Sequence, residues 1–204
     1  MNKIKVNFEN LTENERATLL RLVEKSNKCK RNLADIEIGK TFKIGDVEFI
    51  KFEDKHGVTT AVTKDIVFNS NFGENNNFAE SEILKKLKNE FLPKIIEEVG
   101  NENVFCFATD LTTLDGLKPY APLQSKISLP TFDFYRNNVE IFDKYKLDKY
   151  WWLATPDTAQ PHYEPTWAVC VSPNGFICLS DYCSNYGVRP ILKFVSSISV
   201  SCED

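Results

Sequence analysis

Two short stretches near the C-terminus decide how this chain folds: YWWLATP at residues 150–156 and GVRPIL at residues 187–192. Between them lie the apolar run 167–171 and the turn-forming Pro173-Asn174-Gly175. Adjacent side chains of an extended strand point to opposite faces, so at least one of Trp151 and Trp152 belongs to the core. The last third of the chain is therefore predicted to consist of short strands joined by turns.

The closing stretch contains residues with strong conformational or chemical preferences. Gly187 permits a close backbone approach or a positive φ, Pro190 sets an extended edge, and Arg189 can donate to a carboxylate or to several carbonyls. We expect Arg189 to be a buried clamp between a loop and the sheet. Structural roles are thus assigned to Trp151, Trp152, Gly187, Arg189 and Pro190.

Further upstream, the pattern predicts a β-meander followed by helices. The predicted strands cover residues 41–44, 47–52, 59–62 and 66–68, separated by turns at Gly45-Asp46 and His56-Gly57. Apolar residues at helical spacing predict a helix from Ala79 to Phe91 that ends before Pro93, with further helical turns up to Gly100. A strand at 104–107 and a short helix at 132–142 complete the pattern. The fold class is therefore α+β.

The N-terminal residues have a pattern of their own. Apolar and polar residues alternate from Lys3 to Phe8, as in a short half-buried strand. Thr12 and Glu15 form a capping box, which predicts that a helix begins there. The polar and basic stretch 26–31 is typical of a linker.

These patterns divide the chain into two units. A length of 204 residues fits one domain with a small appendage. We expect a strand-helix appendage at residues 1–30, a boundary near residues 28–34, and a main domain at residues 35–204. The appendage is a candidate docking arm or contact between subunits of a homo-oligomer.

Composition narrows the partner classes. The 25 Lys and Arg against 29 Asp and Glu leave a net charge of −4, which lacks the basic excess expected for nucleic-acid binding. No apolar run approaches the roughly 20 residues of a membrane-spanning helix. The first residues lack the apolar core of a secretory signal, so we expect a cytosolic protein whose six cysteines are thiols. The expected partner is a protein or a saccharide.

The terminal pair of motifs, WWLxxP followed by GVRPxL, resembles a family of bacterial and phage domains of unknown function. In that family the first motif usually reads Trp-Trp-Leu-Arg-Ser-Pro, from which Ala154 and Thr155 depart, so a role of that arginine does not carry over. The resemblance covers roughly residues 35–195. It implies a C-type lectin-like fold, similar to that of formylglycine-generating enzymes and of the variable proteins of diversity-generating retroelements. It also implies a phage or prophage origin, and hence the bacterial host cytoplasm or the virion as location.

Two segments of the last third have the composition of recognition loops. The first, 157–166, places His162, Tyr163 and Glu164 between two prolines; the second, 180–186, is rich in Tyr, Ser and Asn. Such residues are used by adaptable binding surfaces, although ordinary solvated loops have them too. In lectin-like relatives, ligand contacts vary just before the closing Gly-x-Arg strand. The predicted contact residues are Tyr163, Trp167, Asp181, Tyr182, Asn185 and Tyr186.

Enzymatic alternatives have less support. Cys178 and Cys183 resemble the thiol pair that holds copper in formylglycine-generating enzymes, and two thiolates can hold Cu(I) linearly. Those enzymes, however, place a long loop between the second cysteine and the closing motif, and that loop is absent here. A hydrolase built on Cys183 and His162 lacks a supporting motif. We expect no catalytic residue, no metal and no cofactor.

Two functions follow from this reading. The first is a non-enzymatic phage or prophage binding protein, such as a receptor-binding module, with a loop-built recognition face in the C-terminal third. The alternative is an intracellular phage effector that binds and inhibits a host defence protein, in the manner of an anti-CRISPR protein.

Overall fold

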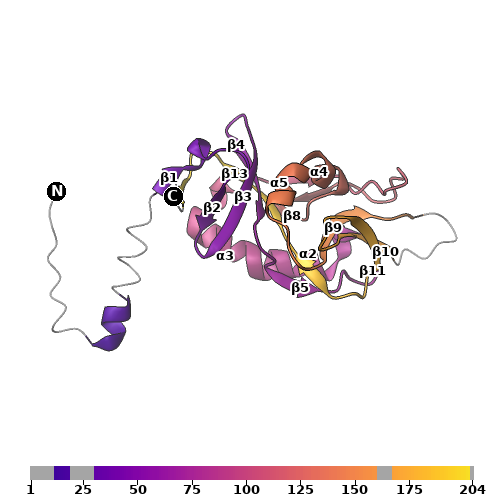
Figure 1. The fold of residues 1–204 in the computed structure, drawn as a ribbon, viewed down its shortest axis with the longest axis horizontal. Helices are drawn as coiled ribbons and strands as arrows, with labels where there is room; N and C mark the ends of the chain where they lie inside the picture. The colour runs from indigo at the N-terminus through magenta and orange to yellow at the C-terminus, as the bar shows by residue number, and fades with distance from the viewer. Residues whose placement is uncertain (1–11, 19–29, 160–166, 203–204) are drawn as a thin grey trace.

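The computed structural model describes residues 12–18, 30–159 and 167–202, which form a mixed α+β fold with mainly antiparallel strands (Figure 1). The α+β prediction is thereby confirmed. Within these residues the larger sheet has the order β1-β14-β2-β3-β4-β13-β8. Its strands are β1 (Lys30–Asn32), β14 (Ser199–Ser201), β2 (Thr41–Ile44), β3 (Val47–Lys55), β4 (Val58–Thr63), β13 (Ile191–Val195) and β8 (Ile127–Ser128).

A second sheet contains the two terminal motifs, in the order β11-β10-β9-β12-β5. Its strands are β11 (Ile177–Asp181), β10 (Trp167–Val171), β9 (Trp151–Pro156), β12 (Tyr186–Val188) and β5 (Phe68–Ser70). Strand β12 runs parallel to β9, with Gly187 opposite Trp151, so both motifs meet at the centre of this sheet. Strands β6 (Phe107–Thr109) and β7 (Leu123–Ser125) pair separately.

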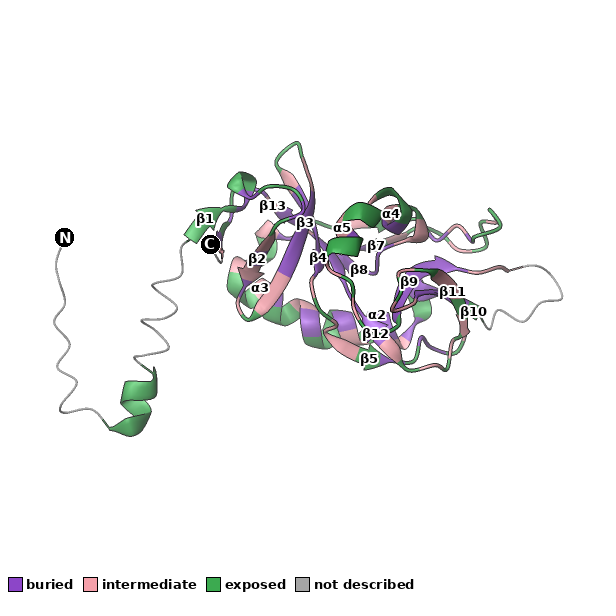
Figure 2. Ribbon diagram, viewed as in Figure 1, coloured by how far each residue is buried: buried purple, intermediate pink, exposed green. Residues whose placement is uncertain are grey.

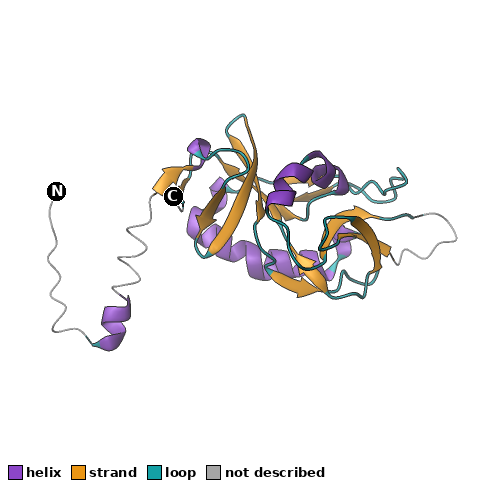
Figure 3. Cartoon of the chain, in the orientation of Figure 1, coloured by secondary structure: helices purple, strands orange, loops and turns teal. Residues whose placement is uncertain are grey.

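The longer helices of the main domain lie in two groups (Figure 3). One runs through η3 (Phe78–Glu80), α2 (Glu82–Lys86), η4 (Leu87–Phe91) and α3 (Leu92–Val99); the other is α4 (Phe132–Asn137) with α5 (Val139–Lys144). Two further short turns are η2 (Leu33–Asp35), which follows β1, and η5 (Asn101–Asn103), which follows α3. No helix in the described ranges is both long enough and apolar enough to span a membrane.

The predicted helix end before Pro93 is wrong, because the helix continues into α3. At η4 the backbone widens into a π turn, in which the amide of Leu92 bonds to the carbonyl of Leu87, five residues back. Pro93 thereby falls in the first turn of α3, where a missing amide hydrogen costs little. The predicted end at Gly100 is confirmed: its φ is +88° and its amide bonds to Ile96 O at 2.8 Å.

Most predicted strands are confirmed with small shifts. The meander appears as β2, β3 and β4, whereas β5 lies two residues beyond the prediction. Of the strand predicted at 104–107, Val104 makes an isolated bridge to Phe194 and β6 begins only at Phe107. The helix predicted at 132–142 is divided into α4 and α5 at Asn138.

The core has two parts, and Trp151 and Trp152 belong to different ones; Figure 2 shows the buried residues in purple. Trp152 belongs to the part that contains the apolar residues of α2, η4 and α3, together with Phe42, Phe49 and Phe194 of the larger sheet. Trp151 belongs to the other part, where it contacts the rings of Tyr135 and Phe142 from α4 and α5. Both indoles are buried, each on its own face of β9.

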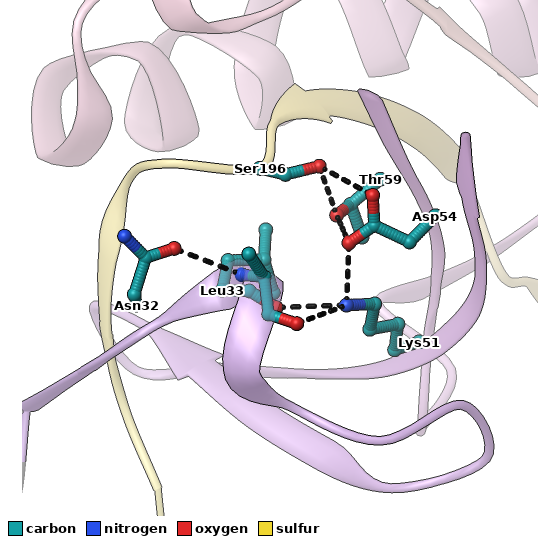
Figure 4. Close-up of polar contacts among 7 residues, drawn as sticks. Asn32, Leu33, Lys51, Asp54, Thr59 and Ser196 are labelled. Atoms are coloured by element: carbon teal, nitrogen blue, oxygen red, sulfur yellow. Dashed lines mark hydrogen bonds and ion pairs between the residues drawn. The ribbon is translucent and has the colours of Figure 1, made fainter. Parts of the chain in front are cut away.

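Residues 30–35 belong to the main domain. β1 pairs with β14, and the side chain of Leu33 is fully buried. The carbonyls of Leu33 and Ala34 accept hydrogen bonds from the buried ammonium of Lys51, which also binds Asp54 (Figure 4). The domain therefore includes residues before the expected start at 35.

Part of the N-terminal appendage is described. Residues 13–18 are helical, and the capping box is confirmed: the Thr12 amide donates to Glu15 Oε2 at 2.9 Å and the Glu15 amide to Thr12 Oγ1 at 3.4 Å. The strand predicted at Lys3–Phe8 lies outside the described residues.

Candidate functional site

The candidate site is built on the hairpin of β10 and β11. The strands pair in regular antiparallel register, with Trp167 opposite Asp181 and Val169 opposite Leu179. The turn closes through the amide of Gly175, which has a φ of +82° and bonds to Ser172 O at 2.9 Å. This hairpin lies at the end of the molecule away from β1, with β11 at the edge of its sheet (Figure 1).

Three large apolar side chains of this hairpin are exposed, and we call them the hairpin surface. Trp167 is 46% exposed, Leu179 39% and Phe176, at the turn, 70%. Residues directly opposite each other share a face of a sheet, so Trp167, Leu179 and Asp181 all project from the same face. The inner part of that face, at Val169 and Val171, is buried in the core.

Asn76 holds the start of β10 in place. Its buried amide nitrogen donates to Thr158 O at 2.9 Å and to Trp167 O at 3.1 Å, and its amide oxygen accepts from the hydroxyl of Tyr120 at 2.8 Å. One side chain thus fixes both ends of the segment between β9 and β10. No local signal in the sequence indicates this role of Asn76, because its three partners lie 44, 82 and 91 residues further along the chain.

The side chain of Asp181 stabilises the turn that follows β11. Asp181 Oδ1 accepts from the Cys183 amide at 3.0 Å, and the Ser184 amide bonds to Asp181 O at 2.9 Å. The backbone hydrogen bond from Cys183 lowers the pKa of Asp181. The Asp181 carboxylate therefore supports this turn in addition to facing solvent.

Tyr182 and Tyr186 pack against the first part of the core. The Tyr186 ring lies 5.0 Å from that of Tyr150 and 4.9 Å from that of Trp152, and its hydroxyl accepts from Ser180 at 3.2 Å. Tyr182 is half-buried, and its carbonyl accepts from the Phe72 amide at 2.7 Å. Both rings belong to the core-facing part of the loop.

The predicted contact residues are therefore divided between two faces of the sheet. Trp167 and Asp181 lie on the same face of the sheet as Leu179, whereas Tyr186 lies on the Trp152 side. Asn185 is exposed in the connecting turn, and Tyr163 lies outside the described residues. Sequence reasoning missed Phe176 and Leu179, although an aromatic residue directly after the Asn174-Gly175 turn was an available signal.

Arg189 is buried near this sheet, and none of the carboxylates in the described part of the chain forms an ion pair with it. Its Nε donates to Thr63 O at 3.1 Å, and its guanidinium lies 5.0 Å from the ring of Trp151 and 5.4 Å from that of Phe142. Burial lowers its pKa to about 10. Gly187 adjoins Tyr150 and Ile66 so closely that an added Cβ would lie 2.3 Å from Ile66 Cδ1. Close approach, and not a positive φ, is therefore the reason for this glycine.

The cysteines of this region are arranged differently from the Cys178 and Cys183 pair considered as an alternative copper site. Cys178 Sγ lies 2.9 Å from Cys170 Sγ across the hairpin, while Cys183 is exposed in the following turn. A hydrogen bond to Asp181 raises the pKa of Cys183. Among the described residues, no group of three or more His, Cys, Asp or Glu side chains could hold a metal ion. His162, the other half of the hydrolase alternative, lies outside them.

Two hollows elsewhere have the size of a small-ligand site. One, of about 540 Å³, is lined by Ala108, Asp110, Thr112, Lys118, Pro119, Tyr120, Ala121 and Pro122. The other, of about 430 Å³, is lined by Lys43, Asp46, Val47, Glu48, Thr63, Asp65, Ile66, Val67, Phe91 and Lys94. Each mixes acidic and basic side chains, so neither selects a ligand of one charge.

No family model, curated protein or solved structure matches this chain. Its function is therefore inferred from its own residues.

Proposed function

We propose that this chain is a phage or prophage binding protein that contacts a protein partner through the hairpin surface. The observation that carries the proposal is the exposure of Trp167, Phe176 and Leu179 on one hairpin. Exposed apolar side chains, here Trp167 and Leu179 on one face of the hairpin and Phe176 at its turn, can serve as interaction sites, and aromatic anchors that become buried on binding supply much of the binding energy. The phage origin rests on the resemblance of the terminal motifs.

A protein is a better partner than a saccharide for this surface. Phe176 and Leu179 have no side-chain donor or acceptor for sugar hydroxyls, whereas both can fill an apolar pocket. Strand β11 is at the sheet edge and can also receive an extended segment of another chain. An intracellular effector that binds a host defence protein would use the same surface.

The finer fold assignment, a C-type lectin-like domain, is part of this proposal. It is supported by the short antiparallel strands with few helices and by the pairing of β1 with β14, which joins the two ends of the domain. The hairpin surface also lies just before the closing strand β12 in the chain, where contacts vary among lectin-like relatives.

The test compares apolar-to-polar variants at two ends of the molecule. Tagged wild-type chain, Trp167→Ser, Leu179→Ser and Ile38→Ser are used to capture proteins from infected or lysogenic bacteria, and the captured protein is then purified and titrated. Ile38 is the matched control, because it is a 58% exposed aliphatic residue outside the hairpin. The hairpin variants are expected to bind at least about tenfold more weakly, which corresponds to about 1.4 kcal/mol.

Two outcomes would overturn the proposal. In the first, the partner binds both hairpin variants as well as it binds wild type. In the second, a glycan array shows saturable saccharide binding that the hairpin variants leave unchanged.

A further inference from the structure

The two cysteines that face each other across the hairpin have the geometry of a disulfide precursor. Cys170 and Cys178 occupy directly opposite positions in β10 and β11, and their Sγ atoms lie 2.9 Å apart. Opposite Cα atoms of antiparallel strands are about 4.5 or 5.5 Å apart, and both spacings fall in the range that a disulfide spans. Because an S–S bond is about 2.05 Å long, the sulfur atoms need to approach by only about 0.9 Å.

The two thiols differ in burial, and this difference determines which of them reacts first with an oxidant. Cys170 is fully buried, and burial together with the hydrogen bond to Cys178 raises its pKa. Cys178 is only partly buried and lies on the edge strand β11. A small oxidant therefore reacts with Cys178 first. Cys170 is then the thiol positioned to displace the oxidant fragment bound to Cys178.

We infer that Cys170 and Cys178 are an oxidation site that forms a disulfide across the hairpin when the chain meets a small disulfide such as glutathione disulfide. The Cys178 thiolate attacks one sulfur of the oxidant, which forms a mixed disulfide and releases one glutathione thiolate. That thiolate takes the proton of Cys170, whose sulfur then attacks Cys178 Sγ. The second glutathione leaves as a thiolate and takes up, through water, the proton that Cys178 lost. Two protein thiols are oxidised, and one glutathione disulfide is reduced to two glutathiones.

The crosslink acts on the strands that carry the hairpin surface. It joins residues eight positions apart and ties the edge strand β11 to β10 between Trp167 and Phe176. An edge strand linked in this way separates from its neighbour less readily. Oxidation is therefore expected to raise the melting temperature and to reverse on addition of a dithiol reductant.

The experiment treats the fully reduced full-length chain with excess glutathione disulfide and follows it by peptide mapping under denaturing conditions. We expect a peptide pair joined through Cys170 and Cys178. Cys178→Ser is expected to lose the crosslink. Cys170→Ala should retain glutathione on Cys178, because the displacing thiol is absent. Cys183→Ser is the control for the neighbouring exposed thiol and should retain the crosslink.

Each other result contradicts the inference. It fails if wild type carries glutathione on Cys178 as stably as Cys170→Ala does, or if neither cysteine of the pair reacts. It also fails if the crosslink joins Cys178 to Cys183. Cys170→Ala tests the assignment even if it is less stable, because the adduct on Cys178 is detected by mass.

Discussion

Lys51 and Asp54 form an ion pair within β3, with Nζ of Lys51 2.6 Å from Oδ2 of Asp54. The same ammonium donates to the carbonyls of Leu33 and Ala34, and the carboxylate also accepts from the hydroxyls of Thr59 and Ser196 (Figure 4). This network connects the segment after β1 to the β3–β4 hairpin and to the turn after β13. A charged pair thus holds together parts of the chain that lie far apart in the sequence.

Loss of either partner of this pair should destabilise the domain. Lys51→Met is expected to lower the free energy of unfolding by about 1–3 kcal/mol, because the buried carbonyl of Leu33, the carbonyl of Ala34 and the carboxylate of Asp54 lose their donor. Asp54→Asn should cost about 3 kcal/mol, because it leaves a buried ammonium without its counter-charge. Denaturant unfolding at neutral pH measures both. Lys55→Met is the control, since its ion pair with Glu53 is exposed.

The pair also predicts a pH dependence. Burial alone would raise the pKa of Asp54, but hydrogen bonds from Lys51 and Ser196, with the charge of Lys51, lower it overall. Because the folded pKa lies below the unfolded value of about 3.9, this stabilisation is complete well above that pH and is lost as the pH falls through the folded pKa. Wild type should lose stability in acid more steeply than Asp54→Asn. Parallel curves would contradict the assignment.

Asn76 should affect binding without touching the partner. Asn76→Ala removes the donors to Thr158 and Trp167, so we expect a loss of about 1–3 kcal/mol in stability and weaker binding at the hairpin surface. Denaturant unfolding and titration of the captured partner measure the two effects. Asn185→Ala, in an exposed turn of the same sheet, should leave stability nearly unchanged.

Gly187 should not accept a side chain. In Gly187→Ala the new methyl group would meet Ile66 Cδ1 at 2.3 Å and Tyr150 O at 3.1 Å, which we expect to cost about 1–3 kcal/mol. Ile66→Ala in the same chain removes the side-chain clash but not the contact with the carbonyl. The loss of stability in the variant that carries both Gly187→Ala and Ile66→Ala should therefore be smaller than the sum of the losses in the two single variants. Strict additivity would show that the clash is not the cause.

The aromatic residues around β9 should differ in their effect on stability. Trp152 is fully buried and donates to Ser70 O at 3.0 Å, so Trp152→Ala is expected to cost about 3–5 kcal/mol. Tyr186→Ala should cost about 1–3 kcal/mol, because its ring packs on Tyr150 and Trp152. Thermal and denaturant melts of both variants check this order. A neutral Tyr186→Ala would indicate that its ring is available to a partner.

Two N-terminal truncations should show which residues the main domain needs for its stability. Removal of residues 1–28 is expected to preserve a cooperative thermal transition, because β1 and Leu33 remain in place. Removal of residues 1–35 should lower or abolish it, because it deletes β1, the buried Leu33 and both carbonyl partners of Lys51. Thermal unfolding of the two truncated chains and of wild type is measured at the same protein concentration. Loss of the transition in the shorter deletion would place the appendage in the core or in an obligate oligomer.

Local signals were sufficient for much of the fold. The capping box at Thr12 and Glu15, the strands β2 to β4 and the helix end at Gly100 all depend on residues within a few positions of each other. Alternation along β9 likewise indicated that Trp151 and Trp152 serve opposite faces. The sequence by itself thus determined the fold class and the position of most elements, because backbone preference and periodicity are local properties.

Only the tertiary structure decided which residues meet. The partners of Lys51, the link from Asn76 to both ends of one loop, the contact of Cys170 with Cys178 and the separation of Trp167 from Tyr186 all depend on strand order and register. The continuation of the helix past Pro93 depends on a π turn that no local preference indicates. Strand order and register are set by the packing of the whole core, because a shift of one residue moves every side chain of a strand to its other face.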